Sequence, residues 1–335
     1  MDNGNRKIIT LFMNKGQKVI FEVDRYNQII RIFDEYTEII PDDALVFSNH
    51  IIELSMPKVM KCGNRFLLNN QVLEKITMPE IRYINDNFLR RNNGLCELDF
   101  PKVRTIGNYF IRCNDKIKNI NFPQLEVIGD YFIDLNRSIE TVSLPNVKSI
   151  GYGFLSSNNK IKEIAMPELE NALGSFLATN MQIKEISFPK LKTIGNHFFR
   201  DSTALVVNLP KVTSIGNNFL ERNYQITSIS LPEVESVGDR FIGGNRAINF
   251  VYMPKLTITG DRFLLENEEL RTIYFPMLEE CGDDFMMYNH RIENIMLPAI
   301  QIVGDSFLLY APLVRKTVFD QMEEKEAKKL VRKKR

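Results

Sequence analysis

The chain has almost no net charge and few of the residues that build catalytic or metal centres. Its 335 residues include 43 Lys or Arg and 42 Asp or Glu, a formal net charge of +1, which argues against a general affinity for nucleic acid. The three histidines, His50, His197 and His290, are far apart and have no recognisable Cys or Ser partner, so neither a metal site nor a catalytic pair is expected. A GxxxxGK(S/T) phosphate-binding motif is also missing. The sequence therefore predicts no enzymatic activity and no cofactor.

Cysteine is scarce as well. The four cysteines, Cys62, Cys96, Cys113 and Cys281, give no disulfide framework. Cys62 and Cys281 occupy a position that is otherwise isoleucine, and we expect both to be small buried hydrophobic residues.

Long apolar runs are missing too. Near the start of the chain the longest, Ile8 to Met13, is short and includes Thr10, which does not fit a secretory signal. No stretch approaches the length of a membrane span. We expect a cytoplasmic protein without a transmembrane segment; a cell-surface or secreted protein is the alternative if a leader has been removed.

What the chain does contain is proline at a fixed period. Every interval in the series is 22 residues except that from Pro189 to Pro210, which is 21. A constant period of this size is typical of a solenoid, in which one supersecondary unit is stacked many times. The twelve members are Pro57, Pro79, Pro101, Pro123, Pro145, Pro167, Pro189, Pro210, Pro232, Pro254, Pro276 and Pro298.

Four other positions of the repeat are nearly constant. Phenylalanine lies nine residues after the proline in all twelve copies, which predicts a continuous buried column of rings. Glycine lies six residues after it in ten copies, which predicts a backbone with positive φ. Asn or Asp follows that glycine position in ten copies and predicts the start of a helical turn. Asparagine recurs four residues after the phenylalanine in ten copies and predicts a ladder of side chains that satisfy backbone groups.

The residues before each proline alternate between apolar and polar, as in a half-buried strand. Proline ends such a strand because it has no amide to donate. The expected fold is an α/β solenoid of about 12–13 turns. Its parallel sheet lies on the concave side, and short helical or 3-10 turns lie on the convex side.

The copy from Pro101, PKVRTIGNYFIRCNDKIKNINF, shows the unit in full. It resembles the leucine-rich repeat, and more narrowly the BspA-like (Treponema pallidum-type) class with its pattern IPxxAFxxCxxLxxIxLP. The segment IIPDDALVFSN at 39–49 stays close to that pattern, whereas most copies have Phe-Leu or Phe-Ile for Ala-Phe and Asn for the Cys. The resemblance covers about residues 36–319. It implies a horseshoe with parallel strands on its concave face, and a role in surface adhesion or protein binding.

The two ends differ from the repeats. Residues 6–35 contain KIITLF, KVIFEV and QIIRIF, which predict strands that cap the exposed end of the core. We therefore assign 1–35 as an N-terminal β-rich cap, 36–319 as the repeats and 320–335 as a charged C-terminal helical tail. That tail has seven Lys or Arg against four Asp or Glu. It is either a solvated capping helix or an electrostatic contact to nucleic acid, acidic lipid or an acidic protein.

A ligand is expected on the outward-facing positions of the concave strands, four and two residues before each proline. The first half of this series is polar and mainly acidic, and the second half has a cluster of aromatic side chains. Aromatic residues on a rigid surface are common anchors for protein partners. The candidate ligand-binding residues are Phe250, Tyr252, Tyr274, Met296, Glu97, Asp99, Glu163 and Glu185.

Two function classes follow from these positions. The first is a non-enzymatic scaffold that binds a protein or peptide partner through the concave face, with the acidic residues orienting a basic part of it. The second is an adhesin-like surface module that binds host protein or glycan. The aromatic side chains also have a purely structural interpretation, which is stacking across strands or cover from the C-terminal segment.

The middle of the repeat series is irregular. Leu173 replaces the glycine, and the next interval is one residue short, with Asp201 or Ser202 near the asparagine position. Such a break either creates a functional bend or reflects neutral drift.

Overall fold

The computed structural model describes residues 7–12, 18–311 and 314. The chain forms two compact units, Met1–Met166 and Pro167–Arg335, called here the N-terminal and C-terminal units. The tail predicted over 320–335 lies outside the described residues. Within the described part no helix has the length and apolar character needed to cross a membrane.

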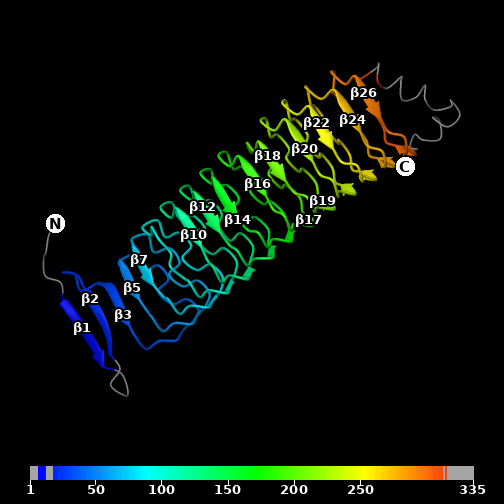
Figure 1. Cartoon of the computed structure of the whole chain (residues 1–335). Helices are drawn as coiled ribbons and strands as arrows, with labels where there is room; N and C mark the ends of the chain where they lie inside the picture. Colours follow the sequence, from blue (N-terminus) through cyan, green and yellow to red (C-terminus); the bar gives the residue numbers. More distant parts are fainter. Residues whose placement is uncertain (1–6, 13–17, 312–313, 315–335) are drawn as a thin grey trace. The chain divides into compact units, whose positions relative to one another are not determined.

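The N-terminal unit begins with three long strands (Figure 1). β1 (Lys7–Phe12) pairs antiparallel with β2 (Lys18–Val23), which pairs antiparallel with β3 (Ile29–Asp34). Buried side chains alternate along β3 with exposed or half-buried ones, as expected for a strand with one face on the core. β3 then runs parallel to the first repeat strand, β5 (Glu53–Ser55). The three strands predicted in this region are confirmed, and their role as a cap stays a prediction.

Most turns of the repeat have a three-residue strand just before the proline and a two-residue strand after it. In the N-terminal unit the three-residue strands after β5 are β7 (Lys75–Thr77), β10 (Asn119–Asn121), β12 (Thr141–Ser143) and β14 (Glu163–Ala165). The two-residue strands are β4 (Ile39–Ile40), β6 (Lys61–Cys62), β8 (Tyr83–Ile84), β9 (Thr105–Ile106), β11 (Val127–Ile128) and β13 (Ser149–Ile150). The three-residue strands pair in parallel in the orders β5-β7, with the longer β3 beside β5, and β10-β12-β14; the two-residue strands pair in the order β4-β6-β8-β9-β11.

The C-terminal unit repeats this plan with two parallel sheets, so both units are parallel β-solenoids. One sheet consists of β16 (Glu185–Ser187), β18 (Val206–Asn208), β20 (Ser228–Ser230), β22 (Phe250–Tyr252), β24 (Thr272–Tyr274) and β26 (Asn294–Met296). The other consists of β15 (Asn171–Ala172), β17 (Thr193–Ile194), β19 (Ser214–Ile215), β21 (Ser236–Val237), β23 (Ile258–Thr259), β25 (Glu280–Cys281) and β27 (Ile302–Val303).

The predicted helical turns are wrong: residues 18–311 form no helix, and the α/β assignment does not hold. After the two-residue strands residues at alternate positions have positive φ, as in Arg65 (57°), Leu67 (52°) and Asn69 (61°); Ile111 and Ile133 are exceptions. A helix needs successive right-handed residues, and here the amides point to neighbouring turns instead. The amide of Arg65 donates to Asp86 O over 2.8 Å and that of Leu67 to Ala44 O over 3.1 Å. One predicted strand is also missing, because 97–99 has no strand structure.

The predicted column of phenylalanine rings is confirmed in both units. In the C-terminal unit Phe241, Phe263 and Phe285 are fully buried, and their rings stack nearly parallel at centroid distances of 5.5 and 5.3 Å. Adjacent rings in the N-terminal unit, such as Phe110 and Phe132, stack at 5.2 Å. Since consecutive rings within each unit contact one another, the column joins the turns of that unit into one core.

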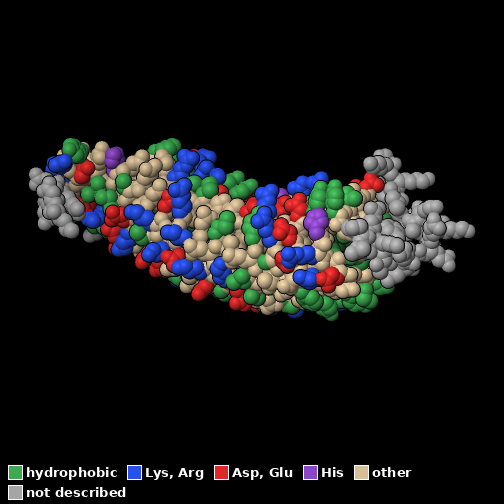
Figure 2. Space-filling model, turned by 90° about the horizontal axis from the view of Figure 1, so that it is seen from above, with side chains coloured by type: hydrophobic (Ala, Val, Ile, Leu, Met, Phe, Trp, Pro, Cys, Tyr) green, Lys and Arg blue, Asp and Glu red, His purple; other side chains and the backbone are tan. Residues whose placement is uncertain are grey.

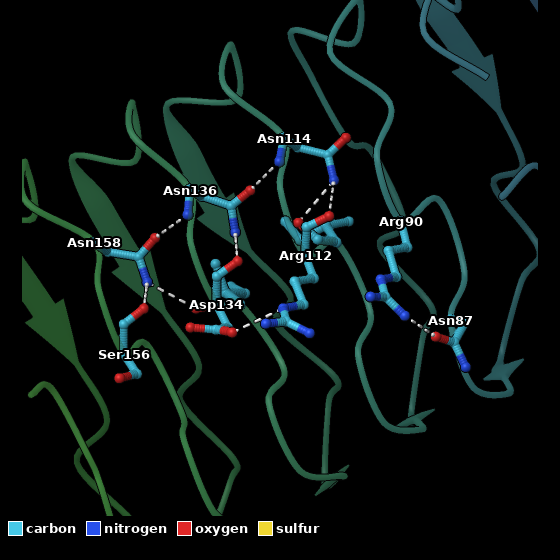
Figure 3. A network of polar contacts seen from close by, with 10 residues as sticks. Asn87, Arg90, Arg112, Asn114, Asp134, Asn136, Ser156 and Asn158 are labelled. Atoms are coloured by element: carbon cyan, nitrogen blue, oxygen red, sulfur yellow. Dashed lines mark hydrogen bonds and ion pairs between the residues drawn. The ribbon is translucent and has the colours of Figure 1, made fainter. Parts of the chain in front are cut away.

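The asparagine ladder is confirmed too (Figure 3). The backbone N–H of Asn114 donates to Oδ1 of Asn136 over 2.6 Å, and the backbone N–H of Asn136 donates to Oδ1 of Asn158 over 3.0 Å. Nδ2 of Asn114 reaches back to Leu89 O, 25 residues earlier, over 3.1 Å. These asparagines are fully buried, so each side chain satisfies backbone groups that water cannot reach.

The repeat glycines do not have positive φ, so that prediction is wrong; they are required by close packing. A Cβ on Gly282 would lie 2.6 Å from Gly260 C and closer still to Oδ1 of Asp261. That oxygen accepts a 2.8 Å hydrogen bond from the amide of Asp283. The Asn or Asp after the glycine is therefore not a helix cap, because its acceptor serves the same position of the next turn.

Replacing Gly282 with alanine should lower the free energy of unfolding by about 2–3 kcal/mol, since the new methyl group must displace backbone and the Asp261 acceptor. Gly243→Ala is the matched control: a Cβ there meets nothing nearer than 3.9 Å, so the change should stay within about 0.5 kcal/mol. Urea denaturation followed by circular dichroism measures both. Equal losses in the two variants would contradict the packing argument.

The short interval after Pro189 is accommodated without loss of strand register. Ser202 takes the asparagine position: it is buried, and its Oγ donates to Leu177 O over 3.3 Å. Ala204 is buried two residues later, and Val206 still pairs with Glu185 of the preceding three-residue strand. The missing residue thus lies in the loop between Ser202 and the strand.

The cysteines follow the repeat as well. Cys62 and Cys281 are fully buried, as predicted, whereas Cys96 is exposed. Burial raises the pKa of the Cys62 thiol far above its ordinary value, so this group is an inert core residue.

Candidate binding surface

Alternation along the three-residue strands decides which side chains face outward. In β20, β22, β24 and β26 the middle residue is buried and its two neighbours are exposed. This is the arrangement predicted for the positions four and two residues before each proline. The surface of this sheet consists of side chains that the core does not constrain.

Strands β22, β24 and β26 are adjacent (Figure 1), and four large side chains lie on their outward-facing positions. Phe250 is 51% exposed, Tyr252 42%, Tyr274 47% and Met296 59%. Tyr252 is the parallel partner of Tyr274, which in turn is the partner of Met296. Within β22 the rings of Phe250 and Tyr252 are nearly parallel at a centroid distance of 6.5 Å. We call these four residues the aromatic patch.

Small side chains border the aromatic patch on one side. Phe250 pairs with Ser228 of β20, and Tyr252 pairs with Ser230. Because serine side chains are short, the ring faces along this border are not covered by the neighbouring strand. Half-exposed aromatic side chains beside small polar residues are typical of protein-binding surfaces.

The four acidic candidates are exposed but are not gathered into one site. Glu185 belongs to β16 of the C-terminal unit, three strands from β22, a separation of about 14 Å. Glu163 lies on β14 of the N-terminal unit, and Glu97 and Asp99 belong to the segment without strand structure. None of these four side chains makes a hydrogen bond or ion pair with another residue that the structure describes.

Most other acidic side chains of the repeats pair with a basic side chain one turn away, which the sequence analysis missed. Oε2 of Glu140 lies 2.8 Å from Nζ of Lys162, and Oε2 of Glu233 lies 2.6 Å from Nζ of Lys255. The hydrogen bond that Glu140 accepts from Lys162 lowers the pKa of the Glu140 carboxyl. The hydrogen bond that Lys255 donates to Glu233 raises the pKa of the Lys255 ammonium. Opposite charges at one repeat position in consecutive copies are the sequence signal for such pairs.

A half-buried ion pair beside the asparagine ladder was also missed (Figure 3). Nε of Arg112 lies 2.9 Å from Oδ2 of Asp134, whose side chain is only 9% exposed. Desolvation raises the pKa of Asp134, although the Arg112 charge opposes this shift. The pair joins two consecutive turns of the solenoid.

Figure 2 shows basic and acidic side chains interspersed on the visible face, with hydrophobic side chains between them. Within the described residues no three His, Cys, Asp or Glu side chains are grouped so as to hold a metal ion. The aromatic patch is thus the candidate site that rests on a distinct cluster of exposed side chains.

Comparison with solved structures shows the fold. A leucine-rich repeat protein from Bacteroides ovatus is 16% identical, with a TM-score of 0.55 and 93% of each chain covered. A leucine rich cell surface protein from Faecalibacterium prausnitzii is 12% identical (TM-score 0.39, 98% of each chain). The pneumococcal vaccine antigen PcpA is 16% identical (TM-score 0.40, 92% of this chain and 82% of that one). The curated proteins contain no match.

The family model of the BspA type leucine rich repeat region matches residues 21–136, 102–206 and 205–312. These matches span the repeats of both units, and the B. ovatus structure has the same fold. The chain belongs to the BspA-type leucine-rich repeat family.

Proposed function

We propose that this chain is a non-enzymatic scaffold that binds a protein partner, and that the aromatic patch anchors this partner. The observation that carries the proposal is the presence of four large, roughly half-exposed side chains on adjacent strands of one sheet. The repeat does not dictate them, because the same outward positions hold serine in the neighbouring strand β20. The fold alone therefore does not explain their size.

A partner that covers these four side chains removes apolar surface from water, which favours binding. Aromatic side chains bury much apolar area and lose little conformational entropy when a partner orders them. The strands that hold Phe250 and Tyr274 are locked between parallel neighbours, so the patch is formed before binding. A preformed surface lowers the cost of association.

From the exposed acidic residues we expect the partner to have a basic region. Glu185 lies on the same sheet as the aromatic patch and has no basic side chain paired with it among the described residues. We propose that it orients a basic part of the partner, with Glu97, Asp99 and Glu163 doing the same on the N-terminal unit. Such contacts contribute more to association rate and orientation than to affinity.

The alternative, an adhesin-like surface module that binds host protein or glycan, makes a different prediction about location. Fractionation of native cells separates the two. Protein found only in the cytosolic fraction would exclude the adhesin, and protein on the cell surface would favour it.

The test of the anchor compares the wild type with the Phe250→Ala, Tyr252→Ala double variant. Affinity capture from native lysate identifies a partner, and titration with the purified partner gives the dissociation constant. We expect an affinity loss of at least about 30-fold, since a central aromatic anchor contributes about 2 kcal/mol or more. Because both side chains are half-exposed, folding should not change.

Tyr83→Ala is the matched control, because Tyr83 is 47% exposed but lies on β8, outside the aromatic patch. It should bind the partner as the wild type does. Wild-type affinity of the double variant would overturn the anchor role of the patch.

A further inference from the structure

The turn after Pro232 has two glycines where the neighbouring turns have side chains. Its sequence is Phe-Ile-Gly-Gly-Asn at 241–245, whereas the adjacent turns read Phe-Leu-Glu-Arg-Asn at 219–223 and Phe-Leu-Leu-Glu-Asn at 263–267. The two missing side chains are those of residues 243 and 244.

The backbone does not require these glycines. A Cβ on Gly243 would meet nothing nearer than 3.9 Å, and one on Gly244 would meet only Cγ of Arg222 at 3.8 Å. Gly244 has a φ of 70°, but the equivalent Arg222 and Glu266 both have 57° and still carry long side chains. The glycines therefore leave a space that the fold does not need.

That space opens into a hollow of about 580 Å³ within the C-terminal unit, a volume within the range of sites for small ligands and side chains. Arg222, Arg240 and Arg246 lie around the two glycines, and the hollow continues over the half-buried Leu265 and Met287. It is formed by the turns, not by the sheet that carries the aromatic patch.

The three arginines have unused hydrogen-bond donors. Arg222 lies 3.6 Å from Asp201, Arg240 3.8 Å from Glu221 and Arg246 3.7 Å from Glu268. These are ion-pair distances that are too long for hydrogen bonds. None of the three guanidinium groups donates a hydrogen bond to another side chain in the described part of the molecule.

The buried carboxylate among them does not neutralise the site. The Glu221 side chain is only 9% exposed, and its Oε2 lies 3.1 Å from Nε of Arg200, outside the ring of three arginines. The charge of Glu221 is thus matched mainly by Arg200, and the arginines around the glycines keep their capacity for a further anion.

We propose that this hollow binds an acidic side chain of a peptide segment, whose carboxylate takes the place left empty at Gly244. Leu265 and Met287 would contact apolar neighbours of that acidic residue. The same hollow is also lined by the acidic side chains Glu266, Glu268 and Asp284. These carboxylates would repel a second negative charge on the peptide. The site therefore selects a single acidic residue among neutral or apolar ones, and rejects polyanions such as nucleic acid or highly sulfated glycan.

The test uses two acetylated and amidated pentapeptides, Ser-Leu-Glu-Leu-Ser and its Gln counterpart, with inorganic phosphate as the free anion. Arginine Nε–Hε signals of the full chain are followed by NMR during titration. We expect saturable shifts with the Glu peptide, at least 10-fold weaker binding of the Gln peptide, and weaker binding of phosphate alone.

Gly244→Glu is the decisive variant, because it supplies a tethered carboxylate at a position where Glu266 shows that glutamate is tolerated. It should fold normally and bind the Glu peptide at least 10-fold more weakly. The Phe250→Ala, Tyr252→Ala variant should bind this peptide like the wild type, so the two proposals fail independently. Equal binding of both peptides, or of the peptide by Gly244→Glu and wild type, would overturn the proposal. Phosphate binding as tight as that of the Glu peptide would show a site for free anions and overturn the peptide assignment.

Discussion

Replacing Asn267 with alanine should lower the free energy of unfolding by about 4 kcal/mol. Oδ1 of Asn267 accepts a 3.1 Å hydrogen bond from the amide of Asn245, and Nδ2 donates to Ile242 O over 3.0 Å. The side chain is fully buried, so water cannot replace it. Each of these two backbone groups then loses its partner, at about 1–3 kcal/mol each. Urea denaturation measures the loss, and hydrogen exchange should show faster exchange of the amides of Asn245 and its neighbours.

Two further variants separate hydrogen bonding from packing. Asn267→Asp keeps the shape but removes the Nδ2 donor and buries a charge, so at neutral pH it should destabilise at least as much as alanine. Asn267→Ser should cost about half as much, because Ser202 shows that a hydroxyl at this position reaches the carbonyl 25 residues earlier. An aspartate variant as stable as the wild type would show that the ladder acts by packing alone.

The positions that build the core could be predicted because the repeat is regular. When parallel turns stack, residues at one repeat position share the same surroundings in every turn. A constant phenylalanine such as Phe263, or a constant asparagine such as Asn114, must then contact its own counterparts. The outward positions of the strands followed from the same logic, so the aromatic patch was found from sequence.

The turns could not be predicted, since their hydrogen bonds connect residues that are distant in sequence. An Asp after glycine is a good helix cap when only its own segment is considered. In the structure Oδ1 of Asp261 accepts from Asp283, 22 residues later, and Gly282 leaves room for that oxygen. Stacking thus overrides local propensity, as tertiary contacts often do.

The hollow at Gly243 and Gly244 escaped the sequence analysis for a related reason. Glycine in this repeat was interpreted as a sign of positive φ, whereas close packing is what requires it at Gly282, and close packing does not require it at these two positions. The sequence does show this difference when its repeats are compared with one another, since residues 243 and 244 are glycines where the adjacent turns have side chains. A departure from a repeat is informative only when the scaffold gives no reason for it.

Replacing Phe263 with alanine should have the largest effect on stability, a loss of about 5 kcal/mol. The side chain is fully buried and stacks on Phe241 and Phe285 at centroid distances of 5.5 and 5.3 Å, and it forms a T-shaped pair with Phe275 at a centroid distance of 5.6 Å. Truncation of a core phenylalanine costs about 3–5 kcal/mol, and each lost ring pair adds about 0.5–1.5 kcal/mol. Urea denaturation of the full chain gives the loss.

Phe263→Leu is the matched control for ring stacking, because it keeps most of the buried apolar volume and should cost only about 1–2 kcal/mol. Hydrogen exchange should locate the damage of the alanine variant in the turns on both sides of residue 263, since stability in a solenoid passes through neighbouring turns. Equal losses for alanine and leucine would mean that the rings contribute through their contacts with one another and not through volume. If amide hydrogen exchange becomes faster only in the substituted turn, the turns are not coupled through the phenylalanine column.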